Sequence, residues 1–131
     1  MSEVRRKAGE LARESLAGGD ATGWFETLYR QAAGDPGGVS WADLAPNPNL
    51  TAWLDGHHVA GGGRRALKVG CGLGDDAEEL ARRGFVVTAF DVSSAVVTVW
   101  LPATGAKVSS VSSSRASMTF WISSGTFEKK L

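Results

Sequence analysis

The sequence is short of cysteine, of excess charge of either sign and of long apolar runs. Cys71 is the single cysteine in 131 residues, so no disulfide can form within the chain, and we expect a cytoplasmic protein. Fourteen basic and fourteen acidic residues cancel, which removes any general attraction to nucleic acid or to an anionic membrane. No apolar run approaches the roughly 18–20 residues of a membrane span, and the charged N-terminus does not resemble a secretory signal. We therefore predict neither a nucleic-acid partner nor a membrane.

What is present is the composition of an ordinary single globular domain. Apolar residues make up 43% of the chain and charged residues 21%. Residues 1–63 are predicted to form an N-terminal helical layer, residues 64–100 a strand-helix-strand-helix unit, and residues 101–131 an atypical serine-rich tail. The expected fold class is α/β.

Three helices are predicted in the N-terminal layer. Residues 2–17 carry few apolar side chains, so the first helix would be mostly solvated. Thr22 would cap the second helix, whose apolar stripe at i,i+4 spacing consists of Trp24, Phe25, Leu28 and Tyr29. After a break at residues 34–38, a third helix is predicted over residues 49–55. Its inner side would carry Leu50, Trp53 and Leu54. The glycines at 61–63 are predicted to form a flexible connector.

The stretch from Ala66 to Asp91 organises the chain. A short strand over residues 66–69 leads into a glycine loop at residues 70–74 and a helix. The nearly all-apolar residues 85–90 then form a strand that we expect to be buried on both faces. Because strand-helix-strand connections are right-handed and join parallel strands, both strands end at the same edge of the sheet. The glycine loop and Asp91 should therefore lie side by side.

The helix between these strands, predicted over residues 75–83, has several local signals. Asp75 and Glu78 fit the spacing of a capping box. Gly84 occupies the left-handed position that commonly follows a helix. Two ion pairs stand at i,i+4 in the favourable order, Glu78–Arg82 and Glu79–Arg83.

The segments after Asp91 have weaker patterns. Ser93 would cap a helix that runs to about Trp100. From residue 101 onward serine is abundant and Glu128 is the only acid, so most of the tail is predicted to be loop or disordered. The candidate strands within the tail are residues 108–111 and 118–122.

The glycine loop indicates the kind of ligand. Its glycines alternate as G-x-G-x-G at Gly70, Gly72 and Gly74. The dinucleotide fingerprint G-x-G-x-x-G would need glycine at position 75, where the chain has Asp75 followed by Asp76. Two carboxylates at a helix start occupy the place where a pyrophosphate binds, and they repel it. A phosphate-free, positively charged ligand such as S-adenosyl-L-methionine fits better, and Asp91 can accept hydrogen bonds from an unphosphorylated ribose.

These residues resemble class I S-adenosylmethionine-dependent methyltransferases over roughly residues 22–100. The resemblance rests on Val69 to Asp76 (VGCGLGDD) and on Val87 to Ser93 (VTAFDVS). Trp41 to Pro48 (WADLAPNP) is similar to the segment ahead of the glycine loop in the thiopurine methyltransferase-like branch. The resemblance implies a partial Rossmann-like methyltransferase fold with N-terminal helices, S-adenosyl-L-methionine as the cofactor, and methyl transfer to a small-molecule acceptor.

The same resemblance implies a set of cofactor-binding residues. The loop glycines would line the methionine part of the cofactor, Asp91 would hold the ribose, Val92 would pack on the adenine, and two tryptophans would close over the site as a lid. The full set is Trp24, Trp41, Gly70, Cys71, Gly72, Leu73, Gly74, Asp91, Val92 and Ser93. No catalytic residue and no metal are implied, because the reaction depends on positioning and desolvation.

The chain departs from the family pattern in two places. Lys68 stands two residues before the first loop glycine, where many members have an acid. No match continues after Val99, so the chain is expected to be the front part of a methyltransferase joined to an unrelated tail, and to be incomplete as an enzyme. Two other hypotheses stay open. One is a non-enzymatic remnant or interaction module that self-associates through an exposed sheet edge, and the other is an NAD(P)- or flavin-binding Rossmann protein.

Each candidate site feature also has a plainer structural interpretation. Asp91 could be a strand-end helix cap, and the aromatic stripe could be core packing. Cys71 would then be a small residue that fits a tight turn, and the adjacent pair His57-His58 would be solvated in a loop. The glycine loop itself could be a strand-to-helix turn without a ligand.

Overall fold

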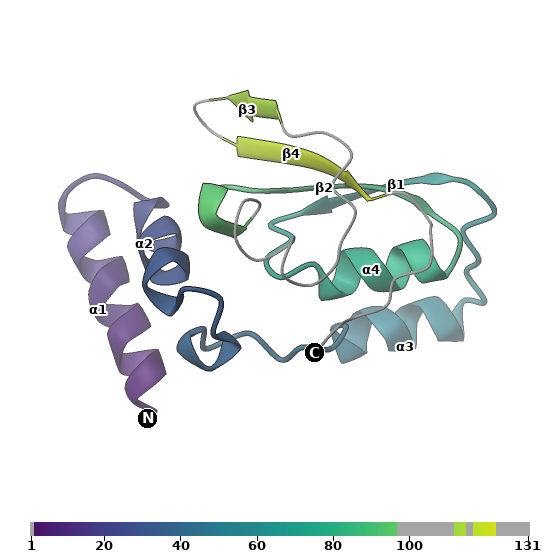
Figure 1. Cartoon of the computed structure of the whole chain (residues 1–131). Helices are drawn as coiled ribbons and strands as arrows, with labels where there is room; N and C mark the ends of the chain where they lie inside the picture. Colours follow the sequence, from purple (N-terminus) through teal and green to yellow (C-terminus); the bar gives the residue numbers. More distant parts are fainter. Residues whose placement is uncertain (1, 97–111, 115–116, 123–131) are drawn as a thin grey trace.

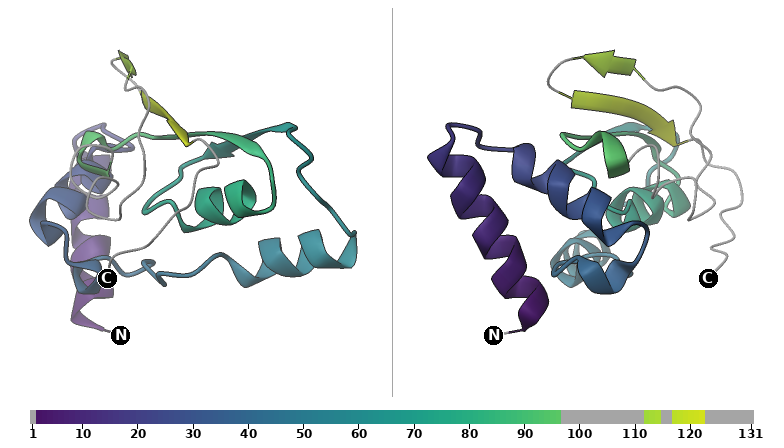
Figure 2. Two further views of the ribbon diagram at one scale, coloured as in Figure 1. Left: turned by 45° about the vertical axis from the view of Figure 1, so that its right-hand side comes forward. Right: turned by 60° about the vertical axis from the view of Figure 1, so that its left-hand side comes forward.

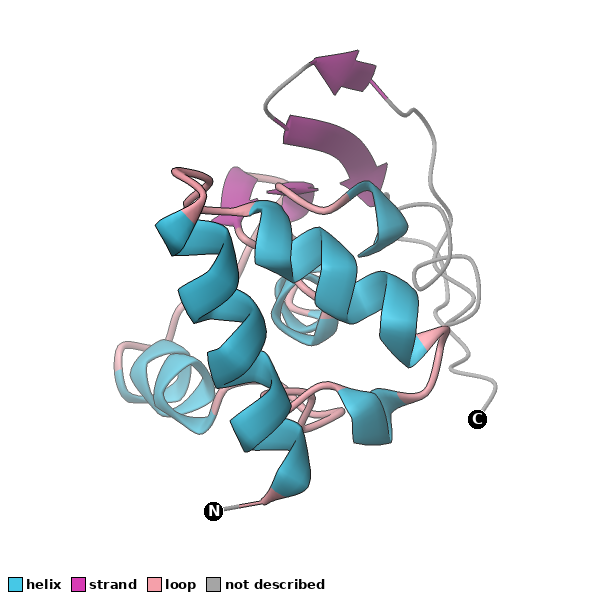
Figure 3. Ribbon diagram, turned by 90° about the vertical axis from the view of Figure 1, so that its left-hand side faces the viewer, coloured by secondary structure: helices cyan, strands magenta, loops and turns pink. Residues whose placement is uncertain are grey.

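The computed structural model describes residues 2–96, 112–114 and 117–122 (Figure 1). This part of the chain is mixed α/β. Helix α4 (Asp75–Arg82) covers one face of the sheet, and α3 (Pro48–Gly56) lies beyond α4 (Figure 2, left). Helices α1 (Glu3–Ala17) and α2 (Gly23–Ala32) form a pair at one end of the molecule (Figure 3).

The first two helices agree with the sequence, and Thr22 is the N-cap residue of α2 as predicted, but its side chain does not make the capping hydrogen bond. Ala8 is the only residue of α1 that is buried, so this helix is solvated as predicted. Thr22 occupies the N-cap position of α2 without a side-chain hydrogen bond to the helix. Instead Asp20 Oδ1 accepts hydrogen bonds from the backbone N–H groups of Thr22 and Gly23, at 3.1 and 2.9 Å. A carboxylate is the stronger acceptor for two adjacent amides.

Helix α3 follows the short 3₁₀ turn η1 (Pro36–Gly38) and begins after Asn47, whose side chain accepts a hydrogen bond from Asn49 N at 2.9 Å. Leu54 is buried as predicted. Trp53 is 55% exposed, so its predicted inward position is wrong. It stacks on His57 with ring centroids 4.6 Å apart. Leu54 is the buried residue of this short helix. Because successive residues are about 100° apart around a helix, its neighbour Trp53 points away from the buried side.

The sheet has the strand order β1-β2-β4-β3 in the described residues. Strands β1 (Arg65–Val69) and β2 (Val86–Asp91) are parallel, as predicted. Strand β4 (Ser117–Ile122) confirms the candidate strand at 118–122 and runs antiparallel to β2, while β3 (Ser112–Ser114) runs antiparallel to β4. The other candidate strand, residues 108–111, lies outside the described residues.

Strand β2 is buried on one face only, which corrects the prediction for residues 85–90. Val87 and Ala89 are fully buried, and they belong to the core cluster that also holds Ala77 of α4. Val86 is exposed, and the exposure alternates along the strand. In the described structure α4 covers one face of the sheet. The exposed apolar side chains of Leu67, Val69 and Val86 lie on the other face.

The start of α4 also differs from the prediction. Gly74 is the N-cap, in the left-handed conformation with φ +88°, and Asp75 is the first helical residue. The capping box is therefore wrong, because its first residue lies one position too late to be the cap. Gly84 does adopt the predicted left-handed conformation, with φ +93°.

The ion pairs predicted on α4 are confirmed. Arg82 contacts Glu78 at 2.9 Å, and Arg83 contacts Glu79 at 2.8 Å. Arg83 also contacts Asp55 of α3 at 2.6 Å, so the two helices are joined by a contact that local spacing does not reveal.

The triple-glycine connector packs closely on the turn after α4, which corrects its prediction as a loose linker. Gly61 N donates to Arg83 O at 2.8 Å, and Gly63 N donates to Gly84 O at 2.9 Å. A Cβ atom on Gly61 would stand 2.2 Å from backbone atoms of Gly84 and Phe85. Glycine is thus needed at position 61 for close approach of two backbones.

The helix predicted from Ser93 to about Trp100 is described only at its start, where residues 94–96 turn helically. Residues beyond 96 in that prediction lie outside the described structure. Within the described part of the chain, no helix is long and apolar enough to cross a membrane.

Candidate functional site

The loop between β1 and α4 depends on its three glycines. Gly70, Gly72 and Gly74 have φ angles of +60°, +52° and +88°. These values lie in the left-handed region, which side chains other than glycine rarely adopt. The alternating spacing is therefore a backbone requirement of this turn, whether or not a ligand is bound.

Asp91 joins the end of β2 to the glycine loop, as the parallel arrangement predicts. Its buried carboxylate accepts a hydrogen bond from Gly72 N at Oδ2, 2.9 Å away, and one from Ser93 N at Oδ1, 3.0 Å away. Cys71 N also donates to Phe90 O at 3.0 Å. The plainer interpretation of Asp91 is thus correct in part, because it orders the backbone that follows β2. A carboxylate has about four acceptor positions, and the described residues occupy two of those of Asp91.

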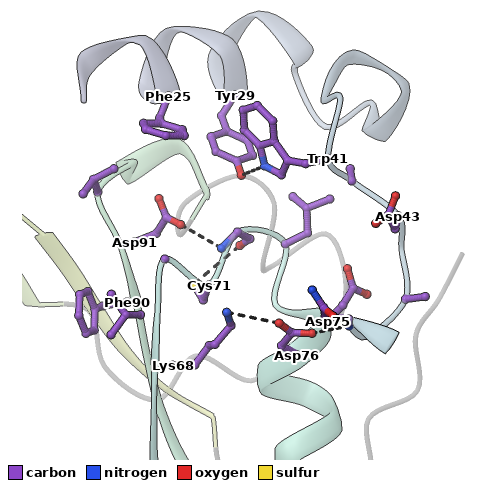
Figure 4. A pocket seen from close by; sticks show the side chains of 18 of the residues that line it. Phe25, Tyr29, Trp41, Asp43, Lys68, Cys71, Asp75, Asp76, Phe90 and Asp91 are labelled. Carbon is purple, nitrogen blue, oxygen red and sulfur yellow. Dashed lines mark hydrogen bonds and ion pairs between the residues drawn. The ribbon is translucent and has the colours of Figure 1, made fainter. Parts of the chain in front are cut away.

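An open pocket of about 480 Å³ lies over this loop (Figure 4). One side is aromatic, with Phe25 and Tyr29 from α2 and Trp41 from the loop after η1. The opposite side consists of the glycine loop and the first turn of α4. Small-molecule sites commonly have volumes of about 300–1,000 Å³, so the pocket is large enough for a nucleoside-sized ligand.

Most of the cofactor-binding residues implied by the resemblance line this pocket. They are Trp41, Gly70, Cys71, Gly72, Leu73, Asp91 and Val92. Trp24, Gly74 and Ser93 are not among the lining residues. Trp24 packs behind the aromatic side, 3.9 Å from the ring centroid of Phe25. Gly74 caps α4, and Ser93 is fully buried.

The aromatic side is held together by a hydrogen bond that the sequence does not reveal. Trp41 Nε1 donates to Tyr29 Oη at 3.0 Å, and the two rings meet edge-on with centroids 6.0 Å apart. Burial raises the pKa of Tyr29 to about 12, and the negative charge of Asp91 adds to this effect. Tyr29 therefore remains a neutral phenol over the physiological pH range. The i,i+4 spacing of Phe25 and Tyr29 marked an apolar stripe, but which cavity it would face depends on the tertiary fold.

The pocket carries an excess of negative charge. Among the residues that the structure describes, those that line the pocket and carry a charge are the acids Asp43, Asp75, Asp76 and Asp91 and the base Lys68. Lys68 Nζ lies 3.3 Å from Asp76 Oδ2, and Asp76 Oδ1 accepts a hydrogen bond from Asn47 N at 2.7 Å. Among the described lining residues four acids therefore face one base, which favours a cationic ligand.

No family model, characterised protein or solved structure matches this chain. What the pocket can bind is therefore inferred from its own geometry and charge.

Cys71 lines the pocket without the properties of a nucleophile. It is buried, and its burial, together with the charge of Asp91, raises the pKa of the thiol to about 12. A thiol of this pKa is almost entirely protonated at neutral pH, and the thiolate is the reactive form. In the part of the chain that the structure describes, no group of three His, Cys, Asp or Glu side chains is arranged to hold a metal ion.

Glu26 is a further residue of the site region that sequence reasoning missed. It reaches from α2 to the segment after β2 and accepts hydrogen bonds from Ser93 Oγ at 2.5 Å, Ser94 Oγ at 2.7 Å and Ala95 N at 3.1 Å. Burial opposes its ionisation, but these hydrogen bonds and the charge of Arg30 outweigh that effect and lower the pKa of Glu26 from 4.5 to about 2. The hydroxyl of Ser93 is therefore engaged with α2.

Proposed function

We propose that the pocket binds S-adenosyl-L-methionine and that the chain is a class I, Rossmann-like methyltransferase acting on a small-molecule acceptor. The observation that carries the proposal is the charge of the described pocket lining, which has four aspartates and one lysine around a glycine loop. The cofactor has a sulfonium and an ammonium group and no phosphate, so its net charge complements this lining.

The charge of the pocket disfavours the alternative of a dinucleotide. A pyrophosphate at the N-terminus of α4 would meet Asp75 and Asp76 in the first helical turn. Two like charges about 5 Å apart repel by about 3 kcal/mol at an effective dielectric constant of about 20. Lys68 lies 3.3 Å from Asp76, and Asp43 adds a further acid to the described lining of the pocket.

Several lining residues suit the parts of this cofactor. The positive-φ turns at Gly70 and Gly72 let the methionine end approach the backbone closely. Asp91 has acceptor positions left for the ribose hydroxyls, and Val92, 46% exposed, offers an apolar surface to the adenine. Methyl transfer would then proceed by in-line attack of the acceptor on the activated methyl group, with the aromatic side of the pocket excluding water.

Binding is tested by calorimetry with S-adenosylhomocysteine and NADH on the full chain. We expect S-adenosylhomocysteine to bind and NADH to bind more weakly. Val92→Ala should weaken S-adenosylhomocysteine binding about fivefold, since about 1 kcal/mol of apolar contact is lost. The matched control Val86→Ala makes the same change at an exposed β2 position outside the pocket and should leave binding unaltered. A folded sample that gives no heat with millimolar S-adenosylhomocysteine would reject the proposal.

Transfer is tested separately from binding. The chain is incubated with S-adenosylmethionine and a mixture of small thiols and amines, and S-adenosylhomocysteine formation is followed by mass spectrometry. Turnover that depends on the added acceptors supports a methyltransferase. If S-adenosylmethionine binds but no acceptor is methylated, the chain would be a cofactor-binding module and not a methyltransferase.

A non-enzymatic interaction module is the second candidate, favoured by the sheet face opposite α4. Leu67 and Val69 of β1 are 63% and 60% exposed, and β1 is an edge strand of the described sheet. Exposed apolar residues on an edge strand favour self-association. Light scattering that shows a monodisperse monomer at high concentration would count against this candidate.

A further inference from the structure

The pocket contains an ion pair whose two members both face the ligand space. Lys68 reaches from the end of β1 towards Asp76 in the first turn of α4 (Figure 4). Their side chains keep 29% and 20% of their surface exposed, so neither charge is sealed in the core. A positive and a negative group therefore stand 3.3 Å apart on one part of the pocket lining.

The pair is held in place by three separate segments of the chain. Lys68 lies in β1, where its backbone is opposite Ala89 of β2. Asp76 is fixed in α4 and also accepts the hydrogen bond from Asn47 N at 2.7 Å. Because both charges are positioned before a ligand arrives, little ordering is needed to use them for recognition.

A ligand group that carries an ammonium and a carboxylate close together matches this pair. An ammonium group has three N–H donors, so Lys68 can contact a ligand carboxylate while it remains near Asp76. The carboxylate of Asp76, which also lines the pocket, can accept a hydrogen bond from a ligand ammonium beside it. An α-amino acid has its ammonium and carboxylate attached to one carbon, which allows both contacts at once.

We propose that Lys68 and Asp76 select ligands that carry a free α-amino-acid group, with the carboxylate on Lys68. The proposal rests on the proposed function, because S-adenosylmethionine has such a group at its methionine end. It goes further in naming the residues that recognise this end. It also explains how a lysine can stand two positions before the loop glycines in a pocket for a cationic cofactor.

The test compares S-adenosylhomocysteine with 5′-methylthioadenosine, which keeps the nucleoside and thioether but lacks the amino-acid group. We expect the wild-type chain to prefer S-adenosylhomocysteine at least tenfold by calorimetry. Lys68→Met should reduce this preference at least fivefold, mainly by weakening the binding of S-adenosylhomocysteine. Lys7→Met removes the same charge from the exposed surface of α1 and should keep the preference.

Two further measurements test the proposal even if Lys68→Met fails to fold. The double variant Lys68→Met/Asp76→Asn removes both charges, so no partner is left unpaired, and it should also lose the preference. With the wild-type chain, the carboxyl methyl ester of S-adenosylhomocysteine should bind about tenfold more weakly than the free acid.

The outcomes separate the two proposals. If neither S-adenosylhomocysteine nor 5′-methylthioadenosine binds, both the proposed function and this inference are rejected. If the two ligands bind equally, or if the lysine variants keep the wild-type preference, the recognition by Lys68 is overturned while nucleoside binding in the pocket stands.

Discussion

Glu26 of α2 accepts a hydrogen bond of 2.5 Å from the hydroxyl of Ser93, which lies 67 positions later in the chain. Ser93 N in turn donates to Asp91, and Asp91 accepts from Gly72 N. A continuous set of hydrogen bonds therefore connects the helix that forms the aromatic side of the pocket to the glycine loop opposite. The two sides of the pocket are held at a defined separation by this connection.

Replacing Glu26 by glutamine should destabilise the fold. The amide keeps the shape of the side chain but puts an N–H₂ group where hydroxyl and backbone donors point. We expect Glu26→Gln to lower the free energy of unfolding in urea by about 1–3 kcal/mol at pH 7. Glu14→Gln, a matched change on the exposed surface of α1, should alter it by less than about 0.5 kcal/mol.

The same contact should appear in the pH dependence of stability. The pKa of Glu26 is lowered from 4.5 to about 2 in the folded state. Its contribution is therefore fully present above about pH 4.5 and is lost as the pH falls towards 2. Between these pH values the wild-type chain should lose more stability than Glu26→Gln, as measured by urea unfolding. If the free energy of unfolding fell equally with pH in both proteins, the lowered pKa of Glu26 would be contradicted.

Trp41 should report ligand binding by its fluorescence. It lines the pocket, whereas Trp53 is exposed on α3 and is not among the lining residues. We expect S-adenosylhomocysteine to change the tryptophan emission of the wild-type chain and of Trp53→Phe. In Trp41→Phe most of that change should disappear. An undiminished signal in Trp41→Phe would mean that the ligand does not contact the aromatic side of the pocket.

Gly61 should tolerate no side chain. A Cβ atom there would lie 2.2 Å from backbone atoms of the turn after α4, which cannot move without disturbing that helix end. We expect Gly61→Ala to lower the free energy of unfolding by about 2–4 kcal/mol, as measured by thermal or urea unfolding. Gly56→Ala, where the new methyl group meets nothing within 4 Å, should be neutral or stabilising by up to about 1 kcal/mol. Similar losses for both variants would show that the connector is loosely packed.

Cys71 should resist alkylation in the folded protein. With a pKa of about 12, its thiolate fraction at pH 8 is about a thousandfold below that of a thiol with a pKa of 9. We expect iodoacetamide to modify native Cys71 at least a hundredfold more slowly than the chain unfolded in urea, as followed by mass spectrometry. Comparable rates in the two states would show that the loop opens readily.

The sequence alone predicted those features that depend on neighbours along the chain. Helices α1 to α4, the ion pairs of Arg82 and Arg83, and the left-handed Gly84 follow from spacing within one or two helical turns. The meeting of Asp91 with the glycine loop was also predictable, because a parallel strand-helix-strand unit has one common handedness. At the caps the sequence was less accurate, because Thr22 occupies the N-cap position of α2 without the expected side-chain hydrogen bond and Gly74 replaces Asp75 as the cap of α4.

The tertiary structure decided which distant side chains meet. The bonds from Glu26 to Ser93 and from Trp41 to Tyr29, and the pairing of Lys68 with Asp76, join segments whose relative positions have no periodic signal. The same holds for the single buried face of β2, which looked apolar throughout. Local spacing constrains dihedral angles and neighbours within a turn, whereas contacts across the pocket depend on how the helical layer packs on the sheet. For this reason the sequence identified the glycine loop with its neighbouring acids, and the fold decided which aromatic side chains and which pairing of charges face the pocket above it.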